Sequence, residues 1–151
     1  MGTKRADAEQ HEPPEQSFGY LVRKAYRLFD RSLNTGMAER DILPGQWSAM
    51  RVLWLEDGLS QVELAERMRV ERASLTHVLA GLEQSGYITR EPDEADRRKL
   101  RLRLTAKGRQ SRKRLMPIGN GVNARATRDF TEDEKAQLRG LLMRVIDNLE
   151  R

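Results

Sequence analysis

The sequence of 151 residues contains no cysteine and only two histidines, His11 and His77. Without cysteine the chain can form no disulfide, no thiolate zinc site and no cysteine-based redox sensor. The two histidines lie far apart along the chain. We therefore expect neither a histidine-based metal site nor a bound cofactor.

Long apolar runs are also missing. No run approaches the length needed to cross a bilayer. The first residues, MGTKRADAEQHEPPEQ, lack the apolar core of a signal peptide, and Ala6 stands where a myristoylation motif needs Ser or Thr. We expect a soluble cytoplasmic protein without a membrane partner.

Aromatic residues make up only 5% of the chain, whereas charged residues make up 34%. This composition favours a helix-rich protein over a β-sandwich, which needs more aromatic and β-branched residues. A chain of this length forms one compact domain, or one domain with helical extensions.

Apolar residues at helical spacing predict three helices, over residues 18–33, 45–56 and 72–84. Pro44 is suited to the first turn of the second helix, because its missing N–H is not needed there. The polar residues 1–16 precede the first helix and are expected to form a mobile tail.

Capping motifs mark the other helices. Ser60-Gln61-Val62-Glu63 and Thr131-Glu132-Asp133-Glu134 are capping boxes, in which a hydroxyl and a carboxylate each satisfy a free backbone N–H. The first opens a short helix and the second opens the final helix, while Thr105 is a suitable N-cap for the helix between them. We expect a kink or an interruption in that middle helix because it contains three poor helix formers, Pro117, Gly119 and Gly121.

Positive charge is concentrated in one part of the chain. The net charge is +5, and the segment from Arg97 to Arg114 contains ten Lys and Arg and no acid. Such a run is usually a solvated face, but it also suits an anionic partner. Residues 99–104 alternate cations with leucines, as in a strand with one buried face. The alternation points Leu100, Leu102 and Leu104 toward the core, and Lys99, Arg101 and Arg103 away from it.

The helix over 72–84 has an unusual outward face. Opposite its apolar side it presents small and hydrogen-bonding residues, namely Arg72, Ala73, Ser74, Thr76, His77 and Ala80. Small residues permit close approach to the DNA major groove, and Arg, Ser, Thr or His reach base edges there. The alternative is an ordinary surface helix whose small-residue face packs on another element.

The hairpin that follows favours the DNA interpretation. A β-hairpin beside a helix–turn–helix is a wing, whose tip can lie along the minor groove, where arginine is favoured. Outward cations on its strand can bind the flanking phosphates, which give affinity without sequence information.

From Leu43 to Arg109 the chain resembles the MarR-type winged-helix regulators. The most specific part is Asp96-Arg97-Arg98, followed by Leu104-Thr105 and then Gly108. The pattern Leu…Leu-Glu-x-x-Gly-Tyr-Ile-x-Arg at residues 79–90 adds to the resemblance.

This resemblance implies a mainly α fold with a small β-hairpin wing. The implied order is two helices, a short strand, two helices, the two strands of the wing, and two more helices, in an intertwined homodimer. It divides the chain into a tail (1–16), an N-terminal dimerisation helix (17–43), a winged helix-turn-helix DNA-binding domain (44–105) and C-terminal dimerisation helices (106–151). The partner is double-stranded DNA carrying a pseudo-palindromic operator.

The resemblance also implies roles for individual residues. Arg98 would enter the minor groove, with Asp96 orienting it. The recognition helix would read DNA through Arg72, Ala73, Ser74, Thr76 and His77. The wing would act through Asp96, Arg97, Arg98 and Lys99, and the DNA backbone would be contacted by Ser60, Gln61 and Arg101. Proteins of this type are usually repressors released by a small aromatic acid.

Two apolar stripes, on residues 18–33 and 138–149, are more than a chain of this size can cover, which favours pairing with a second copy. An effector pocket is expected to combine aromatic rings with a cation for a carboxylate. The candidate residues are Tyr20, Arg23, Tyr26, Trp47, Met50, Arg51 and Trp54. Alternatively, the tryptophans belong to the core and the arginines to the surface.

Three other classes of function compete with this interpretation. The sequence contains no Ser/His/Asp or Cys/His arrangement, phosphate-cradling glycine loop or metal-ligand cluster, so an enzyme is not expected. A nonspecific architectural DNA-binding protein would also explain the charge. A winged helix that binds only proteins conflicts with the acid-free run from Arg97 to Arg114.

Overall fold

The computed structural model describes residues 13–151, apart from the side chain of Glu39. His11 and most of the tail predicted over 1–16 lie outside these residues, and Pro14–Gln16 form a short 3-10 turn, η1. The remaining elements are α1 (Phe18–Met37), η2 (Ala38–Arg40), α2 (Pro44–Leu53), α3 (Gln61–Met68), α4 (Arg72–Gln84), β1 (Ile88–Pro92), β2 (Leu100–Leu104), α5 (Ala106–Ala126) and α6 (Glu132–Leu149). The predicted mainly α fold with a β-hairpin is confirmed.

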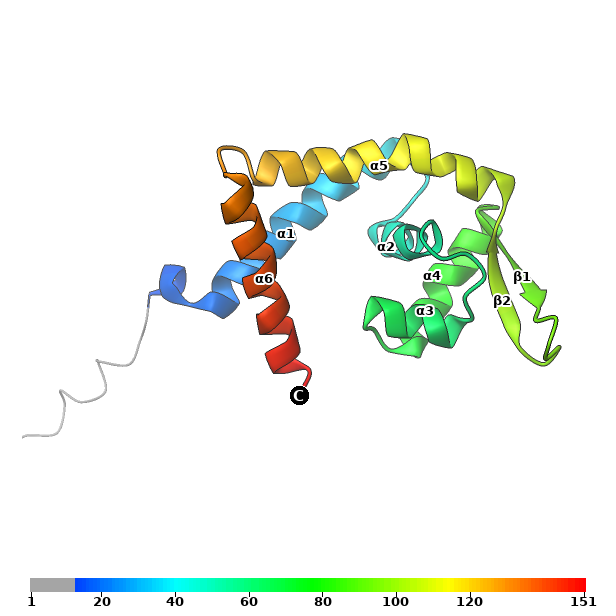
Figure 1. Ribbon diagram of the computed structural model, residues 1–151. Coiled ribbons are helices and arrows are strands. Elements are labelled where there is room, and N and C mark those ends of the chain that lie inside the picture. The colour runs from blue at the N-terminus through cyan, green and yellow to red at the C-terminus, as the bar shows by residue number, and fades with distance from the viewer. Residues whose placement is uncertain (1–12) are drawn as a thin grey trace, which may run out of the picture.

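Helices α2, α3 and α4 and the hairpin form one lobe, from which α5 leads away to pack against α1 (Figure 1). The chain then turns into α6, and Arg69 of the turn between α3 and α4 joins the lobe to the end of this helix by donating to Asp147 (2.9 Å) and to Glu150 (3.2 Å). The core of the lobe is made of fully buried apolar side chains, the largest of which are Met50, Leu53, Leu64, Leu79, Leu82, Tyr87, Ile88 and Leu102. Burial of each such side chain contributes about 1.5–3 kcal/mol, so this small core holds the lobe together.

The predicted caps are present. The hydroxyl of Ser60 accepts from the backbone N–H of Glu63 (3.2 Å), and the carboxylate of Glu63 accepts from the N–H of Ser60 (2.7 Å). Thr131 and Glu134 form the same reciprocal pair at the start of α6. Thr105 caps α5 through the N–H of Gly108. These caps explain why the helices begin where they do.

Of the kink or interruption expected near Pro117, the interruption is wrong, because α5 is continuous from Ala106 to Ala126. Gly119 of α5 and Gly36 of α1 serve close packing instead. A Cβ on Gly119 would collide with the ring of Trp47, and one on Gly36 of α1 would collide with Ile118. The absence of a side chain at these two positions brings α5 close to α1 and α2, and this packing compensates for the backbone hydrogen bond that proline cannot donate.

The strand expected between α2 and α3 is also not formed. The sheet of the described residues contains β1 and β2 only, antiparallel, with Ile88 opposite Leu104 and Pro92 opposite Leu100. The segment before α3 instead adds a single rung, because Gly58 donates its N–H to the carbonyl of Leu102 and Leu59 accepts from the N–H of Leu102. Gly58 has a φ of +84°, which bends the chain away before a strand can continue.

The prediction that three leucines of β2 face the core holds for two of them. Leu102 and Leu104 are buried, but Leu100 is 47% exposed. Leu100 pairs with Pro92 at the outer end of the hairpin, which projects beyond the lobe. The side-chain alternation is therefore correct, but the core does not extend as far as the first leucine.

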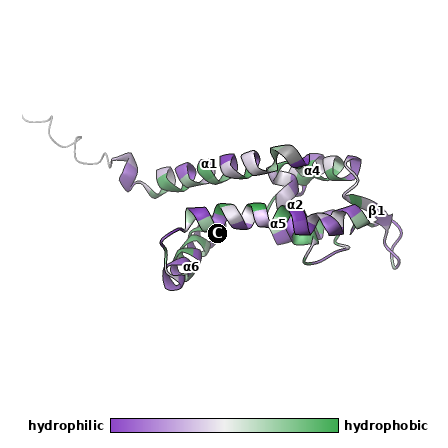
Figure 2. Ribbon diagram, turned by 90° about the horizontal axis from the view of Figure 1, so that it is seen from above, coloured by the Kyte–Doolittle hydropathy of each residue, from purple (hydrophilic) through white to green (hydrophobic). Residues whose placement is uncertain are grey.

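Helix α6 and part of α1 carry apolar side chains that nothing in this single chain covers. No residue of α6 is buried. The exposed large apolar residues include Phe18, Tyr20, Leu21, Val22, Tyr26 and Leu28 of α1, and Leu138, Leu141, Leu142, Met143, Val145, Ile146 and Leu149 of α6. Figure 2 shows hydrophobic residues in green along both helices. Among the described residues, no helix has the length and apolar character that crossing a membrane requires.

Candidate nucleic-acid interface

The outward face of α4 matches its prediction. Leu75, Leu79 and Leu82 are buried against the lobe. The predicted DNA-reading residues, Arg72, Ala73, Ser74, Thr76 and His77, are all exposed. Glu71 precedes the helix and makes no side-chain cap. The first turn of α4 therefore presents backbone N–H groups and the positive end of the helix dipole, which favour an anion.

The start of α3 is tied to α4 by the side chain of Gln61. Its amide nitrogen donates to the carbonyl of Arg72 (3.1 Å) and to the hydroxyl of Thr76 (3.3 Å). Its oxygen accepts from the guanidinium of Arg90 (3.4 Å), which also pairs with Glu83. Gln61 was predicted to contact the DNA backbone, and in this structure it holds the two helices of the helix–turn–helix in register.

The turn of the wing is built on two aspartates. The carboxylate of Asp93 accepts from the backbone N–H groups of Ala95 (2.8 Å) and Asp96 (2.9 Å). Asp96 in turn accepts from Nε (3.0 Å) and Nη2 (3.3 Å) of Arg98. These hydrogen bonds from Arg98 lower the pKa of Asp96 below its ordinary value. The side chain of Arg98 is 91% exposed, so Asp96 orients a guanidinium that points into solvent.

Arg101 behaves differently from the other cations of the wing. Its side chain is 27% exposed and donates to the carboxylates of Asp93 and Glu63. The hydrogen bond from Arg101, together with the backbone N–H groups of the turn, lowers the pKa of Asp93 to about 2. The pKa of Glu63 is lowered mainly by its hydrogen bonds with Ser60, and also by Arg101.

Several of the residues predicted to contact DNA line one hollow of about 530 Å³. It lies between the start of α3, the start of α4 and the wing. Its lining includes Ser60, Gln61, Arg72, Arg90, Arg98, Lys99 and Arg101, with Glu63 as its acid. Residues separated by up to 41 positions in the sequence thus form one basic hollow at the edge of the lobe.

The predicted effector residues do not form one cluster in the structure. Trp47 and Trp54 make an edge contact with ring centroids 5.7 Å apart, and Arg51 lies over the ring of Trp47 at 5.8 Å. Met50 is fully buried in the core. The others, Tyr20, Arg23 and Tyr26, are exposed on the N-terminal half of α1. A hollow of only about 50 Å³ lies beside Trp47 and Arg51.

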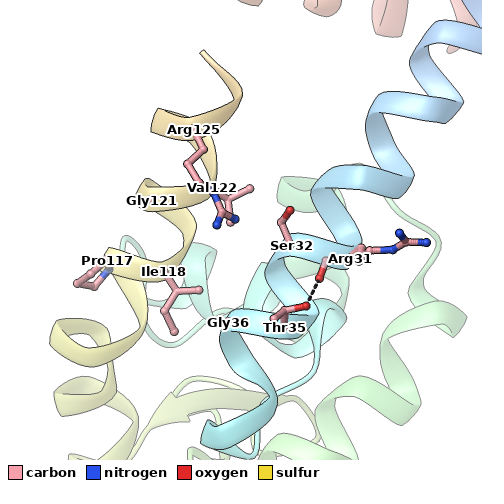
Figure 3. Close-up of a pocket in the computed structure, with 9 residues that line it drawn as sticks. All are labelled: Arg31, Ser32, Thr35, Gly36, Pro117, Ile118, Gly121, Val122 and Arg125. Atoms are coloured by element: carbon pink, nitrogen blue, oxygen red, sulfur yellow. Dashed lines mark hydrogen bonds between the residues drawn. The ribbon is translucent and has the colours of Figure 1, made fainter. Parts of the chain in front are cut away.

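A larger hollow of about 560 Å³ lies between α1 and α5, and sequence reasoning missed it. Figure 3 shows Ser32 of α1 and Ile118, Val122 and Arg125 of α5 pointing into the space between the helices, whereas Arg31 points away. Gly36 and Gly121 line this hollow, and the lack of a side chain at Gly121 was interpreted only as helix breaking rather than as shaping a space between helices.

Metal chemistry has no support in the described part of the chain. No group of three or more His, Asp or Glu residues lies close enough there to hold a metal ion. His77 is exposed on α4, among the other residues of the outward face.

Comparison with known proteins shows that this chain is similar to transcriptional regulators. A sequence model of the MarR family matches residues 42–100. An uncharacterized HTH-type transcriptional regulator, YybA, from Bacillus subtilis is 30% identical over 125 residues, which are 83% of this chain and 83% of that protein.

Solved structures share the fold. The PcaV transcriptional regulator from Streptomyces coelicolor, in complex with its natural ligand, is 26% identical, with a TM-score of 0.82 over 91% of this chain and 96% of that one. A mutant of MarR from E.coli, complexed with operator DNA, is 27% identical, with a TM-score of 0.77 over 84% of this chain and 91% of that one.

Proposed function

Since the chain belongs to the MarR family of transcriptional regulators, we propose that it binds a pseudo-palindromic DNA operator through the hollow between α3, α4 and the wing. In this proposal α4 lies in the major groove and Arg98 enters the minor groove, while Ser60 and Lys99 face the backbone. The protein acts by binding rather than by catalysis, in the cytoplasm.

The observation that carries this proposal is the composition of the hollow. Five cations, Arg72, Arg90, Arg98, Lys99 and Arg101, and one acid, Glu63, line it, and because Arg101 pairs with Glu63 and Asp93 the excess of positive charge comes from the other four. An excess of cations in a concave surface attracts a polyanion and gives the salt-dependent part of DNA affinity. The exposed polar face of α4 beside the hollow supplies the side chains that distinguish bases. The structure of a relative with operator DNA supports the same partner.

We propose that the functional unit is a homodimer. The apolar faces of α1 and α6 are exposed in the single chain, and contact with a second copy would remove them from water. A twofold dimer would set two α4 helices about 34 Å apart, one turn of DNA, which is why the operator is expected to be pseudo-palindromic.

We further propose that the protein is a repressor released by a small aromatic acid. The hollow between α1 and α5 has the volume of a small-molecule site, and Arg125 supplies a cation for a carboxylate. The hollow beside Trp47 and Arg51 is the second candidate, but its volume of about 50 Å³ is too small for an aromatic ring unless it opens. PcaV, a relative of the same fold, was solved with its natural ligand.

The test is a fluorescence anisotropy titration with the promoter DNA beside the protein's own gene and with random DNA of equal length. A sequence-specific regulator should prefer the promoter by about a thousandfold or more. Equal affinity for both duplexes would instead indicate the alternative, a nonspecific architectural DNA-binding protein. A panel of aromatic acids is then added to the promoter complex, and release identifies the effector. Loss of release in R125A but not in R51A would place the effector between α1 and α5.

A further inference from the structure

One cation of the wing faces carboxylates of its own chain. The guanidinium of Arg101 donates through Nε to Asp93 and through Nη1 to Glu63. A longer contact joins Nη1 to the carbonyl of Gly58 at 3.4 Å. The neighbouring cations of the wing are more exposed, and Arg98 has 91% of its side chain in solvent against 27% for Arg101.

The two carboxylates belong to different parts of the lobe. Asp93 organises the turn of the wing, because its carboxylate also accepts the N–H groups of Ala95 and Asp96. Glu63 organises the start of α3, because its carboxylate accepts the N–H of Ser60. A single side chain of β2 therefore joins the turn that carries Arg98 to the first turn of the helix–turn–helix.

The charges of this cluster argue against a phosphate contact by Arg101. One guanidinium and two carboxylates have a net charge of about −1, since the pKa values of both acids are lowered and both remain ionised near neutral pH. A phosphate would have to displace at least one carboxylate from Arg101. Arg98 and Lys99 in the same hollow face no such competition with two acids.

We propose that Arg101 is a positioning residue, which clamps the turn of the wing to the start of α3 so that Arg98 stands at a fixed place relative to α4. This role differs from the DNA-backbone contact expected from the sequence, and it rests on the proposed DNA-binding function. The planar fork of arginine can serve two carboxylates at once, whereas the ammonium of lysine cannot reproduce that geometry.

The effect on DNA affinity of removing the negative charge of Asp93 distinguishes a phosphate contact by Arg101 from a clamp. If Arg101 bound phosphate, removing the negative charge of Asp93 would free it and strengthen DNA binding. If Arg101 clamps the wing, the same removal weakens binding although the surface becomes more positive. Glu94 is the matched control, because it is an exposed acid of the same turn outside the clamp.

The experiment compares R101K, R101Q, D93N and E94Q by anisotropy with the promoter duplex. Thermal melting verifies that each variant is folded at the temperature of the titration. R101K, R101Q and D93N should each lose about tenfold in affinity, the effect of one well-placed contact, whereas E94Q should bind as tightly as the original protein or more tightly. Full affinity in R101K, or tighter binding by D93N, would overturn the clamp.

A double-mutant cycle then tests whether Arg101 acts through Arg98. In the R101Q background the additional loss caused by R98A should be clearly smaller than in the original protein, because the wing arginine is already misplaced. Equal losses in the two backgrounds mean independent contacts and contradict the proposal.

The free protein provides a readout that does not depend on the proposed function. Hydrogen exchange at the backbone amides of Ala95 and Asp96 should accelerate in R101Q and R101K but not in E94Q. If the original protein fails to prefer promoter DNA yet shows this acceleration, the proposed function fails and the clamp stands. Unchanged exchange overturns the clamp itself.

Discussion

The side-chain amide of Gln61 donates a hydrogen bond to the hydroxyl of Thr76 across the helix–turn–helix, over 3.3 Å. The amide can adopt only one orientation, because Arg90 must donate to its oxygen and the carbonyl of Arg72 must accept from its nitrogen. Thr76 is therefore an acceptor toward Gln61. Within residues 13–151 its hydroxyl donates to no protein group, so its hydrogen is available to a base or a phosphate.

The first prediction concerns this hydroxyl. T76V keeps the shape of the side chain and removes the donor, so affinity for the promoter should fall by about tenfold and discrimination at one base position should relax. S74A is the matched control, because the Ser74 hydroxyl already donates to the carbonyl of Glu71 at 2.7 Å and should matter less. The measurement is competition with promoter duplexes in which single purines are replaced by 7-deazapurines or single phosphates by methylphosphonates.

One of those replacements should weaken binding by the original protein but not by T76V. The kind of replacement then identifies the acceptor as a base nitrogen or as a phosphate oxygen. If every replacement weakens T76V and the original protein alike, Thr76 does not donate to DNA.

The second prediction concerns the tip of the wing. R98A should weaken promoter binding by more than about tenfold, because a guanidinium in the narrow minor groove meets a strong negative potential. D96N should cause a smaller loss, since it only removes the carboxylate that orients Arg98. Titration at one fixed salt concentration measures both, and size-exclusion chromatography should give the same mass for both variants and the original protein. Unchanged affinity in R98A would exclude it as the wing reader.

The third prediction concerns the packing of α5. G119A should destabilise the fold by about 1–3 kcal/mol, because the added Cβ collides with the buried ring of Trp47. G140A is the control, because a Cβ at this position of α6 meets nothing within 4 Å. Replacing that glycine should stabilise the helix by about 0.5–1 kcal/mol through helix propensity alone. Urea unfolding measures both changes, and equal effects would show that Gly119 is not required for close packing.

The fourth prediction concerns pH. The pKa of Asp93 is about 2 in the fold and 3.8 ordinarily, so its ionised form stabilises the fold above the ordinary value. That stabilisation is lost as the pH falls through 3.8 toward about 2, where the carboxylate becomes protonated in the fold as well. The melting temperature of the original protein should exceed that of D93N near neutral pH, and the gap should narrow across this window. A gap that stays constant down to about pH 2 would show that Asp93 does not carry it.

The fifth prediction concerns assembly. L141E places a charge within the apolar stripe of α6 and should dissociate the proposed homodimer, because an unpaired charge cannot be buried at low cost. R144E introduces the same side chain away from the centre of that stripe and should leave the dimer intact. Analytical ultracentrifugation over a range of concentrations measures the mass. A monomer in the original protein, or a dimer in L141E, would contradict the proposed interface.

Local chemistry made much of the fold predictable. The capping boxes at Ser60 and Thr131 depend on residues three positions apart, and both form. Helical periodicity predicted an apolar side and a polar outward face for the helix over 72–84, because both follow from 3.6 residues per turn, and the buried residues of α4 are Leu75, Leu79 and Leu82.

The failures all involve contacts between distant segments. Gly119 lies under Trp47, a residue 72 positions earlier, and nothing near Gly119 in the sequence distinguishes this use from helix breaking. Arg101 alternates with leucines as the sequence suggests, but its partner Glu63 becomes visible only when β2 packs beside α3. The exposure of Leu100 depends on where the lobe ends, which periodicity cannot indicate.

The exposure of helix α6 affects how stable this helix is in a single chain. In a single chain its amide hydrogens are shielded from exchange mainly by the helix itself, because none of its 18 residues is buried and the ion pair of Asp147 with Arg69 holds only its last turns. Assembly with a second copy that covers its apolar side chains would stabilise the folded helix. Because such assembly depends on concentration, the fraction of chains with an ordered α6 would rise with the concentration of the protein. If the spacing of the two recognition helices depends on an ordered α6, the affinity of the regulator for DNA rises with its own concentration.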